Sequence, residues 1–153
     1  MADTPEDLRP TLREAGLRAT AQRIAVLGVL RDSRGHLSAD RVAEEVRGRL
    51  GTVSTQAVYD VLDALTSKGL ARRIEPAGSP ALFEGRVADN HHHVVCRVCG
   101  AVEDIDCVVG AAPCMQASDT RGYVLDEAEI TFWGLCPDCQ ETAAESPEAS
   151  ASS

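Results

Sequence analysis

The segment NHHHVVCRVCGAVEDID, residues 90–106, contains three of the four histidines of this 153-residue chain and two of its six cysteines. Its apolar positions predict two short strands, HVVC and AVEDIDC, joined by a turn. Because neighbouring side chains of a strand point to opposite faces, His91 and His93 are expected on one face and His92 on the other. Imidazole and thiol groups follow one another in this segment, which raises the question of whether it serves one metal site, two or none.

The cysteines form two C-x-x-C pairs, Cys96–Cys99 and Cys136–Cys139. This spacing lets two thiolates from one tight turn reach the same tetrahedral zinc ion, and two such turns complete a four-thiolate site. A thiol-disulfide centre normally uses a single C-x-x-C at the start of a helix. We therefore expect a structural zinc held by four cysteines.

The histidines then require different partners. Asp104 or Asp106 on the adjacent strand and Glu84 before the turn would complete a mixed nitrogen and oxygen environment, which suits Fe(II), Mn(II) or Zn(II). The alternative is a solvated run of histidines without a ligand. His36 is the remaining histidine of the chain, and its participation would let a metal clamp the two halves together.

With 44% hydrophobic and 3% aromatic residues, the chain can bury a core built mainly from aliphatic side chains. No apolar run approaches the roughly 20 residues that span a bilayer. The segment MADTPEDLRP also lacks the basic and then apolar pattern of a signal peptide. We expect a cytoplasmic protein, and a reducing cytoplasm favours metal-binding or redox-active cysteines over structural disulfides.

The net charge of −9 is unevenly distributed. Residues 1–83 carry 12 basic and 11 acidic side chains, whereas residues 84–153 carry 3 basic and 13 acidic ones. A nearly neutral half that is rich in arginine can present a basic face to phosphate, and the acidic half is not expected to do so.

Four segments of the first half have apolar residues at helical spacing. They are DLRPTLREAGL (7–17), TAQRIAVLGVLRDS (20–33), SADRVAEEVRGRL (38–50) and STQAVYDVLDALTSKGL (54–70). Thr20 and Ser38 are expected N-caps, Gly16 and Gly69 are expected helix ends, and Leu50 is expected to face inward. LARRIE (70–75) and ALFE (81–84) flank the turn PAGSP and predict a hairpin, so the first half predicts a winged helix-turn-helix.

In this interpretation the fourth helix enters the major groove of DNA, and the hairpin, or wing, approaches phosphate. The open side of that helix carries Thr55, Gln56, Tyr59 and Asp60, and the wing carries Arg72 and Arg73. The alternative is a solvated polar helix face with no DNA partner.

The second half is expected to contain short strands, a helix over residues 108–121 and a further strand segment, YVLDEAEITFWGLC (123–136). We expect domains at residues 1–85 and 86–140, and a disordered tail at 141–153, where hydrophobic residues are few. Cys107 and Cys114 are interpreted as small buried residues, with a redox role as the alternative.

Together these residues resemble the ferric uptake regulator (Fur) family of metal-dependent bacterial repressors, and specifically its peroxide-sensing, catalase-repressing branch. The resemblance covers residues 8–139. GLRATAQR (16–23) is similar to the family's G-x-R-x-T-x-Q-R segment, and HLSAD (36–40) to its H-x-[ST]-A-[DE] segment. The most specific signature is H-x-H-x-x-C-x-x-C at 91–99, paired with the distant C-x-x-C.

The resemblance implies an α+β fold, with an N-terminal winged helix-turn-helix DNA-binding domain and a C-terminal α/β dimerisation domain. It implies a homodimer on double-stranded operator DNA with an inverted repeat, no membrane partner and no organic cofactor. The implied ligands of a structural Zn2+ are Cys96, Cys99, Cys136 and Cys139, and those of a regulatory Fe2+ or Mn2+ are His36, Glu84, His91, His93 and Asp104. The implied DNA contacts are Arg18, Arg23, Thr55, Gln56, Tyr59, Arg72 and Arg73.

The resemblance to the peroxide-sensing branch rests on Asp104. The family's peroxide sensors tend to have aspartate at this position, whereas its iron sensors tend to have glutamate. The resemblance then implies Fe(II)-catalysed oxidation of His36 or His91 by hydrogen peroxide, followed by loss of the metal and derepression of catalase and other peroxide-defence genes. The presence of a single lysine, Lys68, suggests a GC-rich bacterium, where such a regulator is expected. The alternative is an iron- or zinc-responsive uptake repressor that binds its metal reversibly.

Some residues depart from the family pattern. Ala21 stands in place of a usual proline, and Asp60 in place of the usual asparagine after the recognition-helix tyrosine. Glu84 stands where several peroxide sensors have aspartate, and VLDEAEITFWGLC lacks a histidine that many relatives carry. A zinc enzyme is not expected, because the H-x-E and P-C-x-x-C deaminase signature is missing and four thiolates leave zinc no open position for water.

Overall fold

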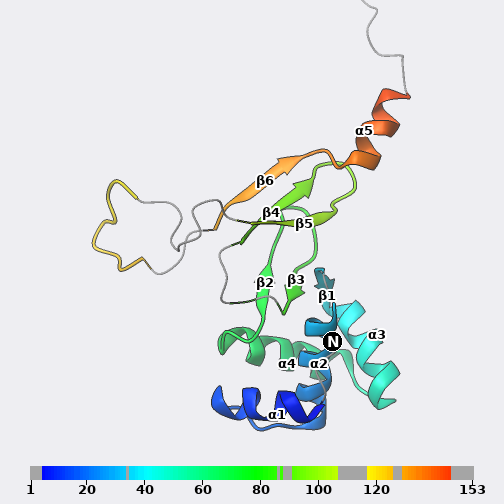
Figure 1. Ribbon diagram of the computed structural model, residues 1–153, viewed down its shortest axis with the longest axis vertical. Coiled ribbons are helices and arrows are strands. Elements are labelled where there is room, and N and C mark those ends of the chain that lie inside the picture. The colour runs from blue at the N-terminus through cyan, green and yellow to red at the C-terminus, as the bar shows by residue number, and fades with distance from the viewer. Residues whose placement is uncertain are drawn as a thin grey trace, which may run out of the picture. The chain divides into compact units, whose positions relative to one another are not determined.

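The computed structural model describes residues 5–33, 35–85, 87, 91–106, 117–125 and 129–145 (Figure 1). The chain divides into two compact units, Met1–Asp89 and Asn90–Ser153. The first unit is mainly helical and the second contains a small sheet, so the α+β class expected from the sequence is confirmed.

The first unit contains all four predicted helices, α1 (Pro5–Glu14), α2 (Ala21–Asp32), α3 (Ala39–Leu50) and α4 (Thr55–Ser67). The hydroxyls of Thr20, Ser38 and Ser54 accept hydrogen bonds from the backbone N–H groups three residues later, as N-caps do. Gly16 and Gly69 have positive φ angles of 77° and 69° just after α1 and α4, which accounts for the helix ends. The predicted helix signals are therefore confirmed.

The helices enclose an aliphatic core that includes Leu8, Leu27, Val46 and Leu62. Leu50, in contrast, was expected to face inward and is 39% exposed. It is the last residue of α3, and the chain turns away at Gly51, whose φ is 84°. The buried stripe of α3 therefore ends at Val46, and Leu50 lies at the end of the helix, outside the core.

Arg47 fixes the turn between α3 and α4. Its Nε donates to the carbonyl oxygen of Val53 at 3.1 Å, and its Nη2 donates to Thr55 Oγ1 at 2.8 Å. These two bonds join the last turn of α3 to the first residue of α4. The side chain of Arg47 thus holds the start of α4, although no sequence motif indicates this role.

The hairpin forms a three-stranded antiparallel sheet with the order β1-β3-β2. Its strands are β1 (Leu37–Ser38), β2 (Arg72–Ile74) and β3 (Leu82–Glu84). The register places Arg72 opposite Glu84, and the β1 register, continued by one residue, places His36 on the other side of Glu84. The fully buried Phe83 points to the opposite face and joins the helical core.

In the second unit, β4 (His91–Cys96) is the central strand. It pairs antiparallel with β5 (Val102–Asp106) and parallel with β6 (Thr131–Gly134). The strand expected over residues 123–136 is therefore shorter, because residues 123–125, 129 and 130 are described outside any strand. Of the helix expected at 108–121, residues 117–121 are not helical, and the remainder, with Cys107 and Cys114, lies outside the described residues.

The helix α5 (Pro137–Ala144) corrects the expected start of the tail. Residues 141–144 were expected to be disordered, but they form the second half of α5. Pro137 at the first helical position begins the helix, and the Gln140 N–H donates to the Cys136 carbonyl. Glutamine, glutamate and alanine then continue it, since all three have high helix propensity. None of the helices described is both long enough and apolar enough to span a bilayer.

Gly85 follows Glu84 at a close approach of β3 to the end of α2. A Cβ at this position would lie 2.9 Å from the backbone C and O of Leu30. We predict that Gly85→Ala lowers the free energy of unfolding by roughly 1–3 kcal/mol, because backbone atoms must move to relieve the overlap. Urea denaturation followed by circular dichroism measures this change.

Gly48→Ala is the matched control, since a Cβ at this position in α3 meets nothing within 4 Å. It should raise stability by up to about 1 kcal/mol through helix propensity. Equal stability of the two alanine variants would contradict the close packing described for Gly85.

Candidate metal centres and nucleic-acid interface

The end of β4 brings the first cysteine pair into a tight turn. Gly100, with a φ of 74°, lets the chain reverse, and its N–H donates to the Cys96 carbonyl at 3.0 Å. The Cys96 N–H donates in turn to the Ala101 carbonyl at 2.9 Å. Cys136 lies between β6 and α5, and its N–H donates to Cys96 Sγ at 3.4 Å. The strand pairing of β4 with β6 therefore brings the two distant pairs together.

The sulfur atoms of Cys96, Cys99, Cys136 and Cys139 all lie within 4.8 Å of one another, and all four cysteines are free thiols. Cys99 Sγ is 3.7 Å from Cys136 Sγ. A tetrahedral zinc with Zn–S bonds of about 2.3 Å separates its sulfurs by about 3.8 Å. The geometry of the cluster therefore fits a four-thiolate zinc site.

The acidities of the thiols support this assignment. Hydrogen bonds from the backbone N–H of Cys99, and then from Cys136 and Val98, lower the pKa of Cys96 to about 6. The Cys136 thiol is the main cause that raises the pKa of Cys139 to about 12. One thiolate thus forms readily, whereas further ionisation beside it is unfavourable without a cation. A zinc ion supplies that compensating charge.

The histidines of β4 are buried and alternate between the two faces as expected. The rings of His91 and His93 have centroids 5.0 Å apart. His92 points to the other face, where its ring centroid lies 6.3 Å from that of Phe132. The prediction from strand alternation is therefore confirmed.

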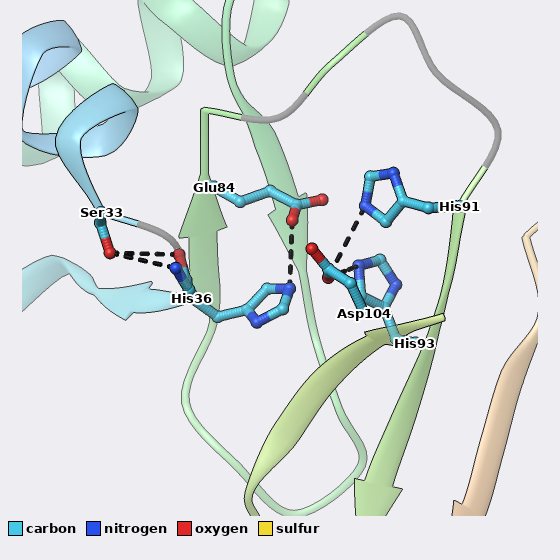
Figure 2. A network of polar contacts seen from close by, with 7 residues as sticks. Ser33, His36, Glu84, His91, His93 and Asp104 are labelled. Atoms are coloured by element: carbon cyan, nitrogen blue, oxygen red, sulfur yellow. Dashed lines mark hydrogen bonds and ion pairs between the residues drawn. The ribbon is translucent and has the colours of Figure 1, made fainter. Parts of the chain in front are cut away.

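Asp104 is the carboxylate that approaches both imidazoles. It lies opposite His93 in the register of β4 and β5. Its Oδ1 is 3.6 Å from His93 Nε2 and 3.8 Å from His91 Nε2 (Figure 2). Glu103 lies opposite Val94 and so belongs to the other face. The register thus distinguishes Asp104 from its acidic neighbour, and it gives the second unit two imidazoles that each approach one carboxylate, which are ligand types that bind Fe(II), Mn(II) or Zn(II).

His36 and Glu84 form a pair within the first unit (Figure 2). His36 Nε2 lies 3.1 Å from Glu84 Oε2, and both side chains are 3% exposed. The loop before His36 is held by hydrogen bonds between the Ser33 hydroxyl and the backbone of Gly35. Burying a carboxylate is costly unless a cation compensates it, so this pair also has the character of a ligand set.

The exposed face of α4 carries three of the predicted DNA contacts, Gln56, Tyr59 and, in part, Thr55. Tyr59 is 41% exposed, whereas Val58, Leu62 and Leu65 are buried on the opposite side. Thr55 accepts the bond from Arg47, and Gln56 Nε2 donates to Asp60 Oδ1 at 2.9 Å. The face therefore consists of polar side chains whose directions are set by packing and hydrogen bonds.

The predicted arginine contacts lie in different surroundings. Arg23 Nη1 donates to the Arg18 carbonyl at 3.1 Å, so these two residues form one local structure before and within α2. Arg73 pairs with Glu75 and lies over the Phe83 ring, 6.0 Å from its centroid. Arg72 lies opposite the buried Glu84. Sequence patterns did not indicate Arg47 or Gly85, since neither has a motif that signals its contacts.

We predict that Cys136→Ser removes most of the bound zinc and lowers the free energy of unfolding of the second unit by several kcal/mol. Structural zinc contributes on the order of 10 kcal/mol to the folding of small zinc domains. Zinc per chain by elemental analysis and thermal unfolding by circular dichroism measure the effect. Cys114→Ser, outside both C-x-x-C pairs, should retain zinc, and equal zinc content in the two variants would contradict the assignment.

Three curated relatives are similar over most of the chain. The transcriptional regulator FurA of Mycobacterium tuberculosis is 54% identical over 133 residues, covering 87% of this chain and 90% of the relative. The ferric uptake regulation protein 1 of Mycolicibacterium fortuitum is 54% identical over 127 residues, covering 83% and 78%. The peroxide operon regulator of Bacillus subtilis is 28% identical over 132 residues, covering 86% and 90%.

The ferric uptake regulator of Pseudomonas aeruginosa, solved with manganese, has the same fold with a TM-score of 0.64. It is 28% identical, and the match covers 84% of this chain and 97% of that one. The sequence model of the ferric uptake regulator family matches residues 14–132. The chain therefore belongs to the ferric uptake regulator family, whose members are metal-responsive transcriptional regulators that act on operator DNA as dimers and are not enzymes.

Proposed function

We propose that this chain is a dimeric transcriptional repressor whose operator binding depends on reversible binding of a divalent ion, Fe(II) or Mn(II). The observation that carries the proposal is that each unit brings buried imidazoles close to a carboxylate, and none of these ligands belongs to the four-thiolate cluster. The proposed ligands of the regulatory ion are His36, Glu84, His91, His93 and Asp104. The four cysteines hold zinc as a structural element.

The chemistry of the ligands supports this division of metals. Thiolates favour zinc, whereas imidazoles mixed with carboxylates suit Fe(II) and Mn(II). Glu84 and Asp104 supply the negative charge that offsets a divalent cation, and their imidazole neighbours complete the set. An ion shared between ligands of both units would favour one arrangement of the units over others, which is how a ligand shifts a conformational equilibrium.

The relatives favour the iron-responsive version of this function. The two relatives at 54% identity are named FurA and ferric uptake regulation protein 1, and the Pseudomonas regulator was solved with manganese. The peroxide operon regulator is far less similar, at 28% identity. Reversible metal binding is therefore our main proposal.

Dimerisation is supported by exposed apolar side chains on β5, on β6 and after β6. Ile105, Phe132, Trp133 and Leu135 are each between 38% and 47% exposed. Exposed apolar side chains on a small unit favour association with another protein surface. A two-fold symmetric dimer presents two copies of α4, so the proposed operator is an inverted repeat. The proposed location is the cytoplasm, where thiols stay reduced.

Peroxide sensing is the second candidate, and the position of Asp104 favours it. Asp104, and not Glu103, faces His91 and His93, and aspartate at this position resembles the peroxide-sensing branch of the family. Fe(II), when bound, can react with hydrogen peroxide and oxidise an imidazole. His36 and His91 are the proposed targets, and oxidation of either would remove a ligand of the regulatory ion.

We predict that the protein binds DNA from its own upstream region when loaded with Fe(II) or Mn(II), and that chelation releases it. At a fixed Mn(II) concentration, Asp104→Asn should weaken DNA binding about tenfold, because loss of one charged ligand costs about 1.4 kcal/mol. Fluorescence anisotropy measures binding. Glu103→Gln, on the same strand but on the other face, opposite Val94, is the control and should bind nearly normally.

Stoichiometric peroxide separates the two candidates. If reversible binding is correct, both metal forms keep DNA after peroxide. If the iron form alone releases DNA and a peptide containing His36 or His91 gains one oxygen, the peroxide-sensing candidate replaces our main proposal. Metal-independent DNA binding would contradict both.

A further inference from the structure

We propose that Asp60 determines base specificity by accepting a hydrogen bond from the N4 amino group of a cytosine in each operator half-site. This inference rests on the proposed function, since it requires α4 to enter the major groove. It concerns the residue at which α4 departs from the asparagine of the family pattern.

The packing of α4 fixes which side chains face outward. Val58, Val61, Leu62 and Leu65 are buried in the helical core, so the helix cannot rotate without exposing them. The bonds of Arg47 to Val53 and Thr55 hold its first turn. Gln56 and Asp60 are then both exposed within the first two turns. In a recognition helix the N-terminal residues are those that reach base edges.

Gln56 orients the Asp60 carboxylate without neutralising it. Gln56 Nε2 lies 2.9 Å from Asp60 Oδ1. An ionised carboxylate only accepts hydrogen bonds. The amide nitrogen of Gln56 must therefore face Asp60, and the amide oxygen of Gln56 points away from Asp60. The hydrogen bond restrains both side chains on the exposed face. Asp60 Oδ2 keeps its capacity to accept a bond from another donor.

The charge of Asp60 excludes most partners on DNA. A carboxylate is repelled by phosphates and by the acceptor atoms O6 and N7 of guanine and O4 of thymine. Amino groups remain, on N4 of cytosine and N6 of adenine. The adenine amino group is adjacent to the acceptor N7, whereas the cytosine amino group is adjacent to a C–H. Cytosine is therefore the base that fits Asp60.

The test is selection of binding sites from a random DNA library by the full-length, zinc-containing protein in the presence of Mn(II). Wild-type protein, Asp60→Asn and Asp63→Asn are compared. Asp63 is exposed on α4 one turn further on, so its substitution removes the same charge from the same helix. Affinities for single-base variants of the selected site are then measured by fluorescence anisotropy.

We expect wild-type protein and Asp63→Asn to select a cytosine at one symmetric position in each half-site, with about tenfold discrimination against the other bases. Asp60→Asn should shift that position toward adenine, because an amide can donate to N7 while it accepts from N6. The same cytosine preference in Asp60→Asn would overturn the inference and leave the proposed function intact. If wild-type protein selects no metal-dependent site, the proposed function fails and the inference fails with it.

Discussion

The register of β4 against its two neighbours is the constraint on which both metal centres of the second unit depend. Antiparallel pairing with β5 places Asp104 opposite His93, and strand alternation adds His91 to the same face. Parallel pairing with β6 carries the chain to Cys136, beside the cysteines at the end of β4. A shift of β5 by one residue would place Glu103 or Ile105 opposite His93 and would move Asp104 to the other face of the sheet.

Strand register also positions the proposed ligands of the first unit, on a sheet with shorter strands. Glu84 of β3 lies between Arg72 of β2 and His36, the residue before β1, and Gly85 lets the end of β3 approach α2 closely. The buried carboxylate is thus held by elements of the helical core. Since α4 packs on that core as well, His36, Glu84 and the proposed DNA-reading face belong to one folded body.

Much of this structure was predictable from local sequence, because helix periodicity, N-caps and C-x-x-C spacing each depend on a few neighbouring residues. The four helices, the wing and the alternation of His91, His92 and His93 are of this kind. Contacts between distant residues were not predictable: the hydrogen bonds of Arg47, the approach of Gly85 to Leu30 and the exposure of Leu50 depend on how elements pack. The prediction of disorder from amino-acid composition was also wrong for residues 141–144, because composition does not show that Pro137 begins a helix.

We propose that ligands of both units bind one regulatory ion. A double-mutant cycle tests it, with His36→Ala in the first unit, His93→Ala in the second, and Mn(II) affinity of the zinc-containing protein measured by calorimetry. If both histidines ligate the same ion, each substitution weakens binding and the double variant is much less impaired than the sum of the two effects. Additive effects, or two Mn(II) ions bound independently per chain, would contradict a shared site.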